Sequence, residues 1–298
     1  MSHSWLDPKV LARLQTLQLR AQHIVEGYVA GAHRSPYKGF SIEFAEHREY
    51  APGDDLRYVD WKVFGRTDKF YLKQYEDETN LVAYVVLDAS ESMSYQGPDA
   101  SLTKYEYAQC LSAALSWLVL HQQDAVGMTV FDEQIRHSVR PSSNASHLHQ
   151  LLQVMESTTP VAKTATGPIF HELAERFRKR GVVIIISDFF DDVDTMMAGL
   201  KHFRHRRHDV VLMHVLDPAE LDFPFSRPTM FQGLEAFPEI LADPKSLRRA
   251  YLEEFQRFCK KLSTACRTHG IDYQQMRTDQ PLDRVLANYL SQRMARMD

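Results

Sequence analysis

Two apolar segments of this chain each run into an aspartate, and they constrain the fold more than any other feature. Residues 81–87, LVAYVVL, lead into Asp88, and residues 182–186, VVIII, are followed by Ser187 and Asp188. Continuous apolar runs of this length are typical of strands that are buried on both faces of a parallel sheet. We therefore expect a central sheet with helices covering both of its faces.

Predicted strands and helices alternate from residue 81 onward. Helical spacing of apolar residues predicts helices at 105–121, 147–155, 168–179, 193–205, 244–269 and 282–294. Apolar runs predict further strands at 125–131, 210–216 and 271–276. We also expect 135–139 to form a hairpin beside 125–131, and the Phe- and Pro-rich residues 222–238 to form a loop or hairpin. This alternation predicts an α/β fold with a doubly wound, mostly parallel, Rossmann-like sheet flanked by helices.

The first 80 residues follow a different pattern. A helix is expected over residues 8–29, and a segment rich in Gly, Pro, Tyr and charged residues follows it. Short alternating stretches at 40–44 and 70–75, separated by turn signals, indicate a small β-rich module. We therefore predict an N-terminal helix plus β-rich module over 1–80 and an α/β domain over 81–298.

Composition limits the class of protein. Hydrophobic residues make up 44% and charged residues 25%, which is ordinary for a globular protein, and a net charge of −4 gives no general attraction to nucleic acid. Three cysteines, Cys110, Cys259 and Cys266, do not form a disulfide framework or a CxxC metal site. No apolar run approaches the roughly 20 residues that span a bilayer, and the N-terminus does not resemble a signal peptide. We expect a cytoplasmic protein that does not insert into membranes.

Oxygen-bearing side chains follow the first buried strand at alternating positions: Asp88, Ser90 and Ser92. Asp and Ser also cap helices and form turns, because their side-chain oxygens accept backbone N–H groups. One such residue would need no other explanation. Three oxygens at this spacing exceed what a single cap requires, which favours a binding role.

A second group of oxygens is expected at the same edge of the sheet. Carboxyl ends of parallel strands lie on one edge, so Asp188 should face the same crevice as Asp88. Either Thr166 or Thr164, from the loop before the third predicted helix, adds a hydroxyl. Mg²⁺ takes oxygen ligands, often only one or two carboxylates with several waters, and Mn²⁺ is the next candidate. The pattern therefore predicts a Mg²⁺ or Mn²⁺ site.

The D-x-S-x-S sequence at Asp88, Ser90 and Ser92 resembles the first motif of the metal-ion-dependent adhesion site in von Willebrand factor A-like domains. The resemblance covers about residues 81–294 and implies that Thr166 supplies the family's threonine ligand and Asp188 its third-loop aspartate. In that family a carboxylate from a partner completes the shell of the cation. The resemblance thus implies a docking function.

Residues 48–62, REYAPGDDLRYVDWK, resemble the signature of the bacterial domain of unknown function family 58. Members carry this segment before a von Willebrand factor A-like domain, and many work with MoxR-type AAA+ ATPases. The resemblance implies metal-dependent recruitment of such an ATPase or of its client protein. Because arginine and aromatic residues are favoured at contact surfaces, we expect partner binding or a tether at Arg48, Asp54, Arg57, Asp60 and Trp61.

An enzymatic alternative is a metal-dependent phosphotransferase or hydrolase of the haloacid-dehalogenase type, which also places an acid after its first strand. Such an enzyme needs a second acid two positions later to protonate the leaving group. Ser90 stands at that position, and a hydroxyl is a poor acid. A serine hydrolase is disfavoured because no G-x-S-x-G sequence is present. We therefore predict a non-enzymatic interaction protein.

Overall fold

The computed structural model describes residues 16–32, 47–49, 71–73, 81–161, 163, 165–227, 229–231 and 240–294. The chain forms two compact units, one of Met1–Arg34 with Leu81–Asp298 and the other of Ser35–Asn80. This grouping differs from the expected division at residue 80, because the N-terminal helix belongs with the α/β unit.

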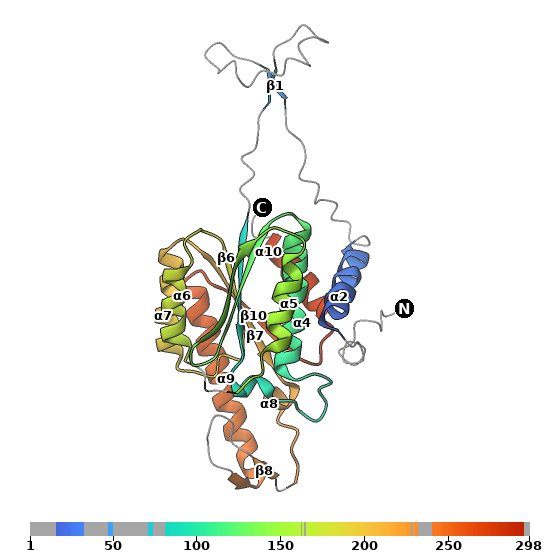
Figure 1. Ribbon diagram of the computed structural model, residues 1–298. Helices are drawn as coiled ribbons and strands as arrows, with labels where there is room; N and C mark the ends of the chain where they lie inside the picture. The colour runs from blue at the N-terminus through green and yellow to red at the C-terminus, as the bar shows by residue number, and fades with distance from the viewer. Residues whose placement is uncertain are drawn as a thin grey trace. The chain divides into compact units, whose positions relative to one another are not determined.

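A six-stranded sheet is the centre of the larger unit, with the strand order β10-β7-β6-β3-β4-β5. Neighbouring strands are parallel except for β4 and β5, which pair antiparallel. The expected doubly wound, mostly parallel α/β fold is confirmed (Figure 1). The strands are β3 (Val82–Asp88), β4 (Ala125–Phe131), β5 (Ile135–Ser142), β6 (Val182–Ser187), β7 (Asp209–Leu216) and β10 (Asp272–Arg277).

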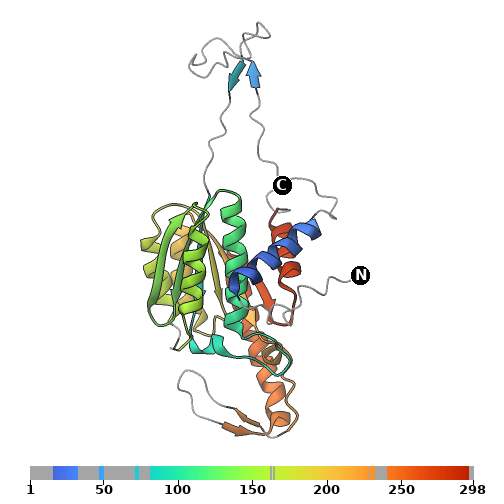
Figure 2. The same cartoon turned by 45° about the vertical axis from the view of Figure 1, so that its right-hand side comes forward.

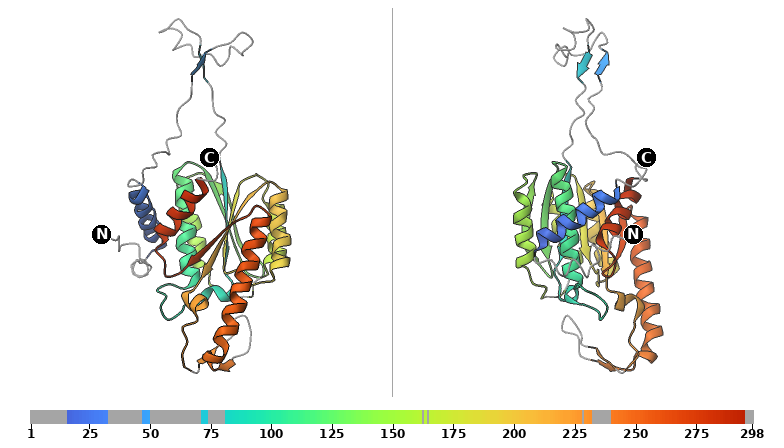
Figure 3. Two further views of the ribbon diagram at one scale, coloured as in Figure 1. Left: turned by 180° about the vertical axis from the view of Figure 1, so that it is seen from behind. Right: turned by 90° about the vertical axis from the view of Figure 1, so that its right-hand side faces the viewer.

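Helices cover both faces of this sheet, because the inner strands are apolar on both sides. In β3, Ala83, Val85 and Leu87 enter one core, while alternate residues of the strand enter the other. One face packs against α4 (Lys104–His121), α5 (His147–Ser157) and α10 (Leu282–Met294). The other packs against α6 (Thr166–Arg176), α7 (Val193–His205) and α9 (Pro244–Thr268). Figure 3 shows α9 and α10 on opposite faces.

Helix α2 (Leu17–Ala32) adds an outer layer over the first of these faces. It lies against α4 and α10, as Figure 2 shows. Leu17, Ala21, Ile24 and Val25 form its buried stripe, at the spacing of one helix face. This apolar contact is the physical reason that the helix joins the α/β unit.

Strand β5 forms one edge of the sheet and pairs irregularly with β4. The register shifts between Val126 and Met128 and again between Val130 and Phe131. His137, Arg140 and Pro141 on β5 are exposed. The expected hairpin is confirmed and extends to Ser142.

The segment between β7 and α9 contains a short helix that the sequence reading did not predict, α8 (Pro218–Asp222). Asp217 caps it, Glu220 completes a capping box, and Pro218 takes the first helical position, where a missing N–H does no harm. Beyond it, β8 (Thr229–Phe231) pairs antiparallel with β9 (Ile240–Ala242), which confirms a hairpin there.

In the smaller unit, β1 (His47–Glu49) pairs antiparallel with β2 (Tyr71–Lys73). Strand β2 lies within the predicted stretch 70–75, whereas the predicted stretch 40–44 lies outside the described residues. Across the described ranges of the chain, none of the helices combines the length and the apolar character needed to cross a membrane.

Candidate functional site

Four neighbouring parallel strands run into a buried aspartate, and these residues define the carboxyl edge of the sheet. Asp88 ends β3, Asp132 follows β4, Asp188 follows β6 and Asp217 follows β7. Each is at most 2% exposed. Because buried carboxylates need hydrogen-bond or charge partners, the partners of each one indicate its role.

Asp88 is held by hydroxyl and backbone donors. Its Oδ1 accepts the backbone N–H of Ser90 at 2.8 Å, and its Oδ2 accepts the hydroxyl of Ser187 at 2.5 Å. The Oγ atoms of Ser90 and Ser92 lie 3.1 Å apart. Ser90 precedes the short helix η3 (Glu91–Ser94), yet its side chain makes no capping hydrogen bond. Helix capping therefore does not account for the two serine hydroxyls.

Among the basic side chains that the structure describes, none forms an ion pair with Asp88. Burial raises the pKa of Asp88 to about 7, and the nearby negative charge of Asp188 adds to this effect. Two buried carboxylates that repel each other would be stabilised by a cation that both could reach. Asp88 therefore differs from Asp188 in having no ion-pair partner among the described side chains.

Asp188 already has an internal cation. Its Oδ2 lies 2.7 Å from the Nζ of Lys104, and the same Nζ lies 2.6 Å from Oε1 of Glu220. Lys104 is 1% exposed and its Nζ is 4.7 Å from the centre of the Phe190 ring. Burial alone would lower the pKa of Lys104, but the two carboxylates raise it above its ordinary value.

The sequence analysis missed Lys104, although a signal exists in the sequence. Lys104 is the first residue of α4, directly after the Thr103 cap. The positive end of the helix dipole disfavours a cation there. A lysine that breaks this local preference calls for a tertiary partner, which the structure identifies as the Asp188–Glu220 pair.

A tight turn after β6 brings Asp191 to Thr166. Phe189 has a φ of 54°, in the left-handed region that large side chains rarely adopt, and its N–H donates to Ser187 Oγ at 2.8 Å. Asp191 Oδ2 then accepts both the hydroxyl of Thr166, at 2.7 Å, and its backbone N–H, at 2.9 Å. Such strained residues cluster at functional sites.

Thr166 is the first residue of α6, so this helix begins two residues before the predicted start at Pro168. Ala165, its neighbour, donates its backbone N–H to the carbonyl of Asp132 at 3.4 Å, which holds this loop at the carboxyl edge. Asp191, the partner of Thr166, was not predicted. Thr164, the alternative ligand, lies outside the described residues.

The predicted donors fit a hard divalent cation in their chemistry. They are two carboxylates and three hydroxyls on the β3, β6 and α6 segments, and each oxygen keeps lone pairs beyond its present hydrogen bond. In the part of the chain that the structure describes, no three His, Cys, Asp or Glu side chains form a metal-binding group. A site here would therefore depend on the hydroxyls.

All five predicted ligands are buried: Asp88, Ser90, Thr166 and Asp188 at 0% exposure and Ser92 at 7%. A carboxylate from another protein would reach them only after local opening. The loop before α6 contains Val161, which is 59% exposed, so an apolar side chain faces solvent in the same loop.

The predicted partner-binding residues are mostly not covered by the structure. Arg48 lies in β1, where its backbone pairs with Leu72 of β2, and its side chain is not described. Asp54, Arg57, Asp60 and Trp61 lie outside the described residues. A role for this segment in partner binding therefore stays a prediction.

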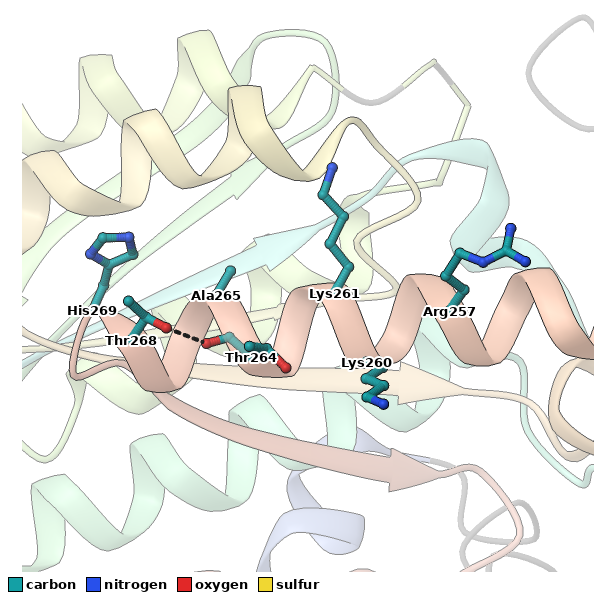
Figure 4. Close-up of a pocket in the computed structure, with 7 residues that line it drawn as sticks. All are labelled: Arg257, Lys260, Lys261, Thr264, Ala265, Thr268 and His269. Carbon is teal, nitrogen blue, oxygen red and sulfur yellow. Dashed lines mark hydrogen bonds between the residues drawn. The ribbon is translucent and has the colours of Figure 1, made fainter.

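An open hollow of about 450 Å³ lies along α9 rather than at the carboxyl edge (Figure 4). Its cationic side chains include Lys261, which pairs with Asp194, and Arg257, which pairs with Glu254. None of the five predicted ligands lines it, so it is separate from the candidate site. The lining residues are Arg257, Lys260, Lys261, Thr264, Ala265, Thr268 and His269.

The phosphotransferase alternative is not favoured. It requires an acid two positions after Asp88, and Ser90 is there with its Oγ beside that of Ser92. The carboxyl edge therefore has donors for a cation, without the acid that this reaction needs.

Residues 46–258 match the family described as Protein of unknown function DUF58. The uncharacterized proteins Mb1516 of Mycobacterium bovis and Rv1480 of Mycobacterium tuberculosis are each 28% identical to this chain over 233 residues. Each alignment covers 77% of this chain and 72% of the relative.

Solved structures with detectable similarity include BatB from Bacteroides thetaiotaomicron, with a TM-score of 0.42 and 18% identity over 71% of this chain and 98% of that one. An aerotolerance-related membrane protein from Bacteroides fragilis has a TM-score of 0.44 and 18% identity over 71% and 97%. The SpRpn10 VWA domain has a TM-score of 0.40 and 12% identity over 69% and 93%.

Proposed function

The chain belongs to the DUF58 family, and from this premise we propose that it is a non-enzymatic protein-interaction module whose binding depends on Mg²⁺ or Mn²⁺. The proposal rests on the burial and the hydrogen-bond partners of Asp88. Its carboxylate is fully buried, accepts the Ser187 hydroxyl and the Ser90 backbone N–H, and has no basic side chain as a partner among the described residues. A divalent cation supplies the positive charge that this environment lacks.

The roles of the side chains follow from their partners. Asp88, Ser90, Ser92 and Thr166 hold the cation, and Asp188 adds negative charge at its side. Hydroxyl ligands leave the charge of a divalent cation only partly neutralised, so a carboxylate on a partner protein is the chemistry that completes the site.

The partner that the family resemblance suggests is a MoxR-type AAA+ ATPase or its client protein, met in the cytoplasm. Because the ligands are buried, docking is coupled to an opening of the η3 turn or of the loop before α6. The segment containing Arg48, Asp54, Arg57, Asp60 and Trp61 gives a second contact with the same partner.

The experiment is a calorimetric titration of the full chain with Mg²⁺ and with Mn²⁺, comparing wild type with Asp88→Asn. Loss of a charged ligand should weaken binding by at least about tenfold. Asp209→Asn, which removes an exposed carboxylate at the start of β7, is the matched control and should bind as wild type does. Equal affinity of Asp88→Asn and wild type would refute the site.

Partner dependence needs a separate measurement. Binding of a purified MoxR-type ATPase should be strong in Mg²⁺ and lost in excess chelator. Binding that persists unchanged in chelator would remove the metal from the docking mechanism.

A further inference from the structure

We propose that Lys104 is an internal competitor of the divalent cation at the carboxyl edge, and that Glu220 sets how strongly it competes. The inference rests on the proposed metal site and specifies its regulation. Its basis is one juxtaposition: the ammonium of Lys104 sits between Asp188, 2.7 Å away, and Glu220, 2.6 Å away.

The burial of Lys104 makes this contact strong. Lysine is rarely fully buried unless it is paired, and here it is 1% exposed, with Asp188 at 0% and Glu220 at 13%. Charge interactions at such a site are weakly screened by solvent. The ammonium therefore neutralises Asp188 far more completely than a surface lysine would.

A cation bound beside Asp88 and Asp188 experiences Lys104 in two ways. The ammonium already occupies the Oδ2 of Asp188, and its positive charge repels a divalent cation nearby. Both effects lower the affinity for metal. Glu220 accepts from the same Nζ, so it holds part of the ammonium charge away from Asp188.

Glu220 belongs to α8, in the segment between β7 and α9. Its side chain also accepts the backbone N–H of Asp217 at 2.8 Å, which fixes it relative to the end of β7. If the Lys104–Glu220 contact were weakened, the ammonium would pair with Asp188 alone, and the affinity for the metal would fall.

Two substitutions with opposite expected signs distinguish this role from a purely structural ion pair. Lys104→Met removes the competitor, so Mg²⁺ should bind at least about tenfold more tightly than in wild type. Glu220→Gln releases the ammonium to Asp188, so Mg²⁺ should bind several-fold more weakly. Asp222→Asn removes an exposed carboxylate from the same helix, where it pairs with Arg277, and controls for the lost charge.

The readouts are calorimetric titration with Mg²⁺ and the rise in Tm that Mg²⁺ produces. Lys104→Met leaves Asp188 and Glu220 without their cation, so its metal-free Tm should fall and its rise with Mg²⁺ should exceed that of wild type. If this variant does not fold without metal, the Glu220→Gln titration decides the proposal alone, because its affinity must fall below that of Asp222→Asn.

The outcomes separate the two proposals. Two results would overturn the competitor role while leaving the metal site supported. The first is an Mg²⁺ affinity that Lys104→Met leaves unchanged or lowers. The second is an Mg²⁺ affinity of Glu220→Gln that equals that of Asp222→Asn. Absence of Mg²⁺ binding in every variant overturns the metal site and the competitor together. Binding in Lys104→Met but not in wild type supports both.

Discussion

The carboxyl and amino ends of the sheet's strands differ in the side chains that are buried there. At the carboxyl edge, four strands run into buried aspartates whose partners are hydroxyls, backbone N–H groups, Arg136 and Lys104. At the amino edge, where the parallel strands begin, the rings of Tyr84, Phe177, Phe203 and His208 pack together, and Gly181 lies close to Val82. Tyr84 stacks on Phe177 with ring centres 4.0 Å apart, and its hydroxyl donates to the carbonyl of Lys179 at 3.1 Å.

This contrast separates stability from binding within one sheet. Stacked rings and close backbone contacts are favourable without any ligand. Buried carboxylates oppose folding unless something neutralises or hydrogen-bonds them. The packing at the amino edge therefore stabilises the unit, while the carboxyl edge buries Asp88, whose pKa is raised by burial and by the charge of Asp188. Substitutions at the amino edge should change the free energy of unfolding, whereas substitution of Asp88 at the carboxyl edge should mainly change the affinity for Mg²⁺.

The largest expected effect on stability is at the amino edge. A Cβ on Gly181 would lie 2.0 Å from the backbone oxygen of Val82, so Gly181→Ala forces the chain to move and should cost about 3 kcal/mol of unfolding free energy. Urea denaturation measures this, and the Mg²⁺ affinity of the folded protein should not change.

Gly127→Ala is the matched control for this substitution. Its added Cβ would meet the exposed Pro141 of the edge strand β5, with Cγ at 2.9 Å and Cδ and the backbone N at 3.0 Å, which is less close than the 2.0 Å contact at Gly181. It should destabilise less than Gly181→Ala. Gly127 pairs with Tyr84 at the same level of the sheet, so an equal or larger loss would show that the Gly181–Val82 contact is not the tighter of the two.

The next largest effect is a difference in unfolding free energy between substitutions at two aspartates of the carboxyl edge, Asp217 and Asp88. Asp217 accepts the N–H of Gly97 at 2.9 Å and of Ala219 at 2.8 Å, on different oxygens. Asp217→Asn replaces one acceptor with a donor and should cost about 2 kcal/mol. Asp88→Asn also loses hydrogen bonds, but it removes repulsion with Asp188 and should cost less than about 1 kcal/mol in chelator.

Denaturation of both variants in the same chelator buffer tests this difference. Similar losses for the two substitutions would mean that Asp88 is a structural acid like Asp217. Equal losses of unfolding free energy would then remove the electrostatic argument for a cation at Asp88.

The smallest effect concerns pH and His208, which lies at the amino edge just before β7. Burial among Tyr84, Phe177 and Phe203 lowers the pKa of His208 below its ordinary 6.5, and Arg206 and Arg180 add to this. The neutral ring is favoured in the fold, so its contribution is complete above pH 6.5. It is lost as the pH falls below 6.5, because the unfolded chain binds the proton first.

His208→Gln should therefore flatten the stability profile between pH 7 and pH 5 by less than about 1 kcal/mol, as measured by denaturation at each pH. Above pH 8 the difference between variant and wild type should be constant. An unchanged slope below pH 6.5 would assign the acid sensitivity to other groups.

Much of the fold could be predicted from the sequence, because the spacing of apolar residues in helices and the length of apolar runs in strands are local properties of the chain. The strand predicted over residues 81–88 is β3, and the predicted helix over 193–205 is α7 with the same bounds. The placement of α2 was not predictable in this way. An apolar stripe indicates that a helix packs, but it does not identify the surface that receives it.

The candidate site was predicted only in part. Asp88, Ser90 and Ser92 are close in sequence, so their spacing alone brings them together at the end of β3. Lys104 and Asp188 are separated by 84 residues, and Ser187 and Asp88 by 99. These pairings depend on how strands and helices pack, and residue periodicity carries no information about them.

Strand β5 shows how the sheet avoids joining with other molecules. An edge strand exposes unpaired backbone groups that invite a further strand, and long apolar strands behind it increase the risk of aggregation. Here two register shifts distort the ladder, Arg140 adds charge, and Pro141 lacks an N–H to donate. A strand from another chain would find few aligned donors, so this edge protects the apolar interior strands against intermolecular β-sheet growth.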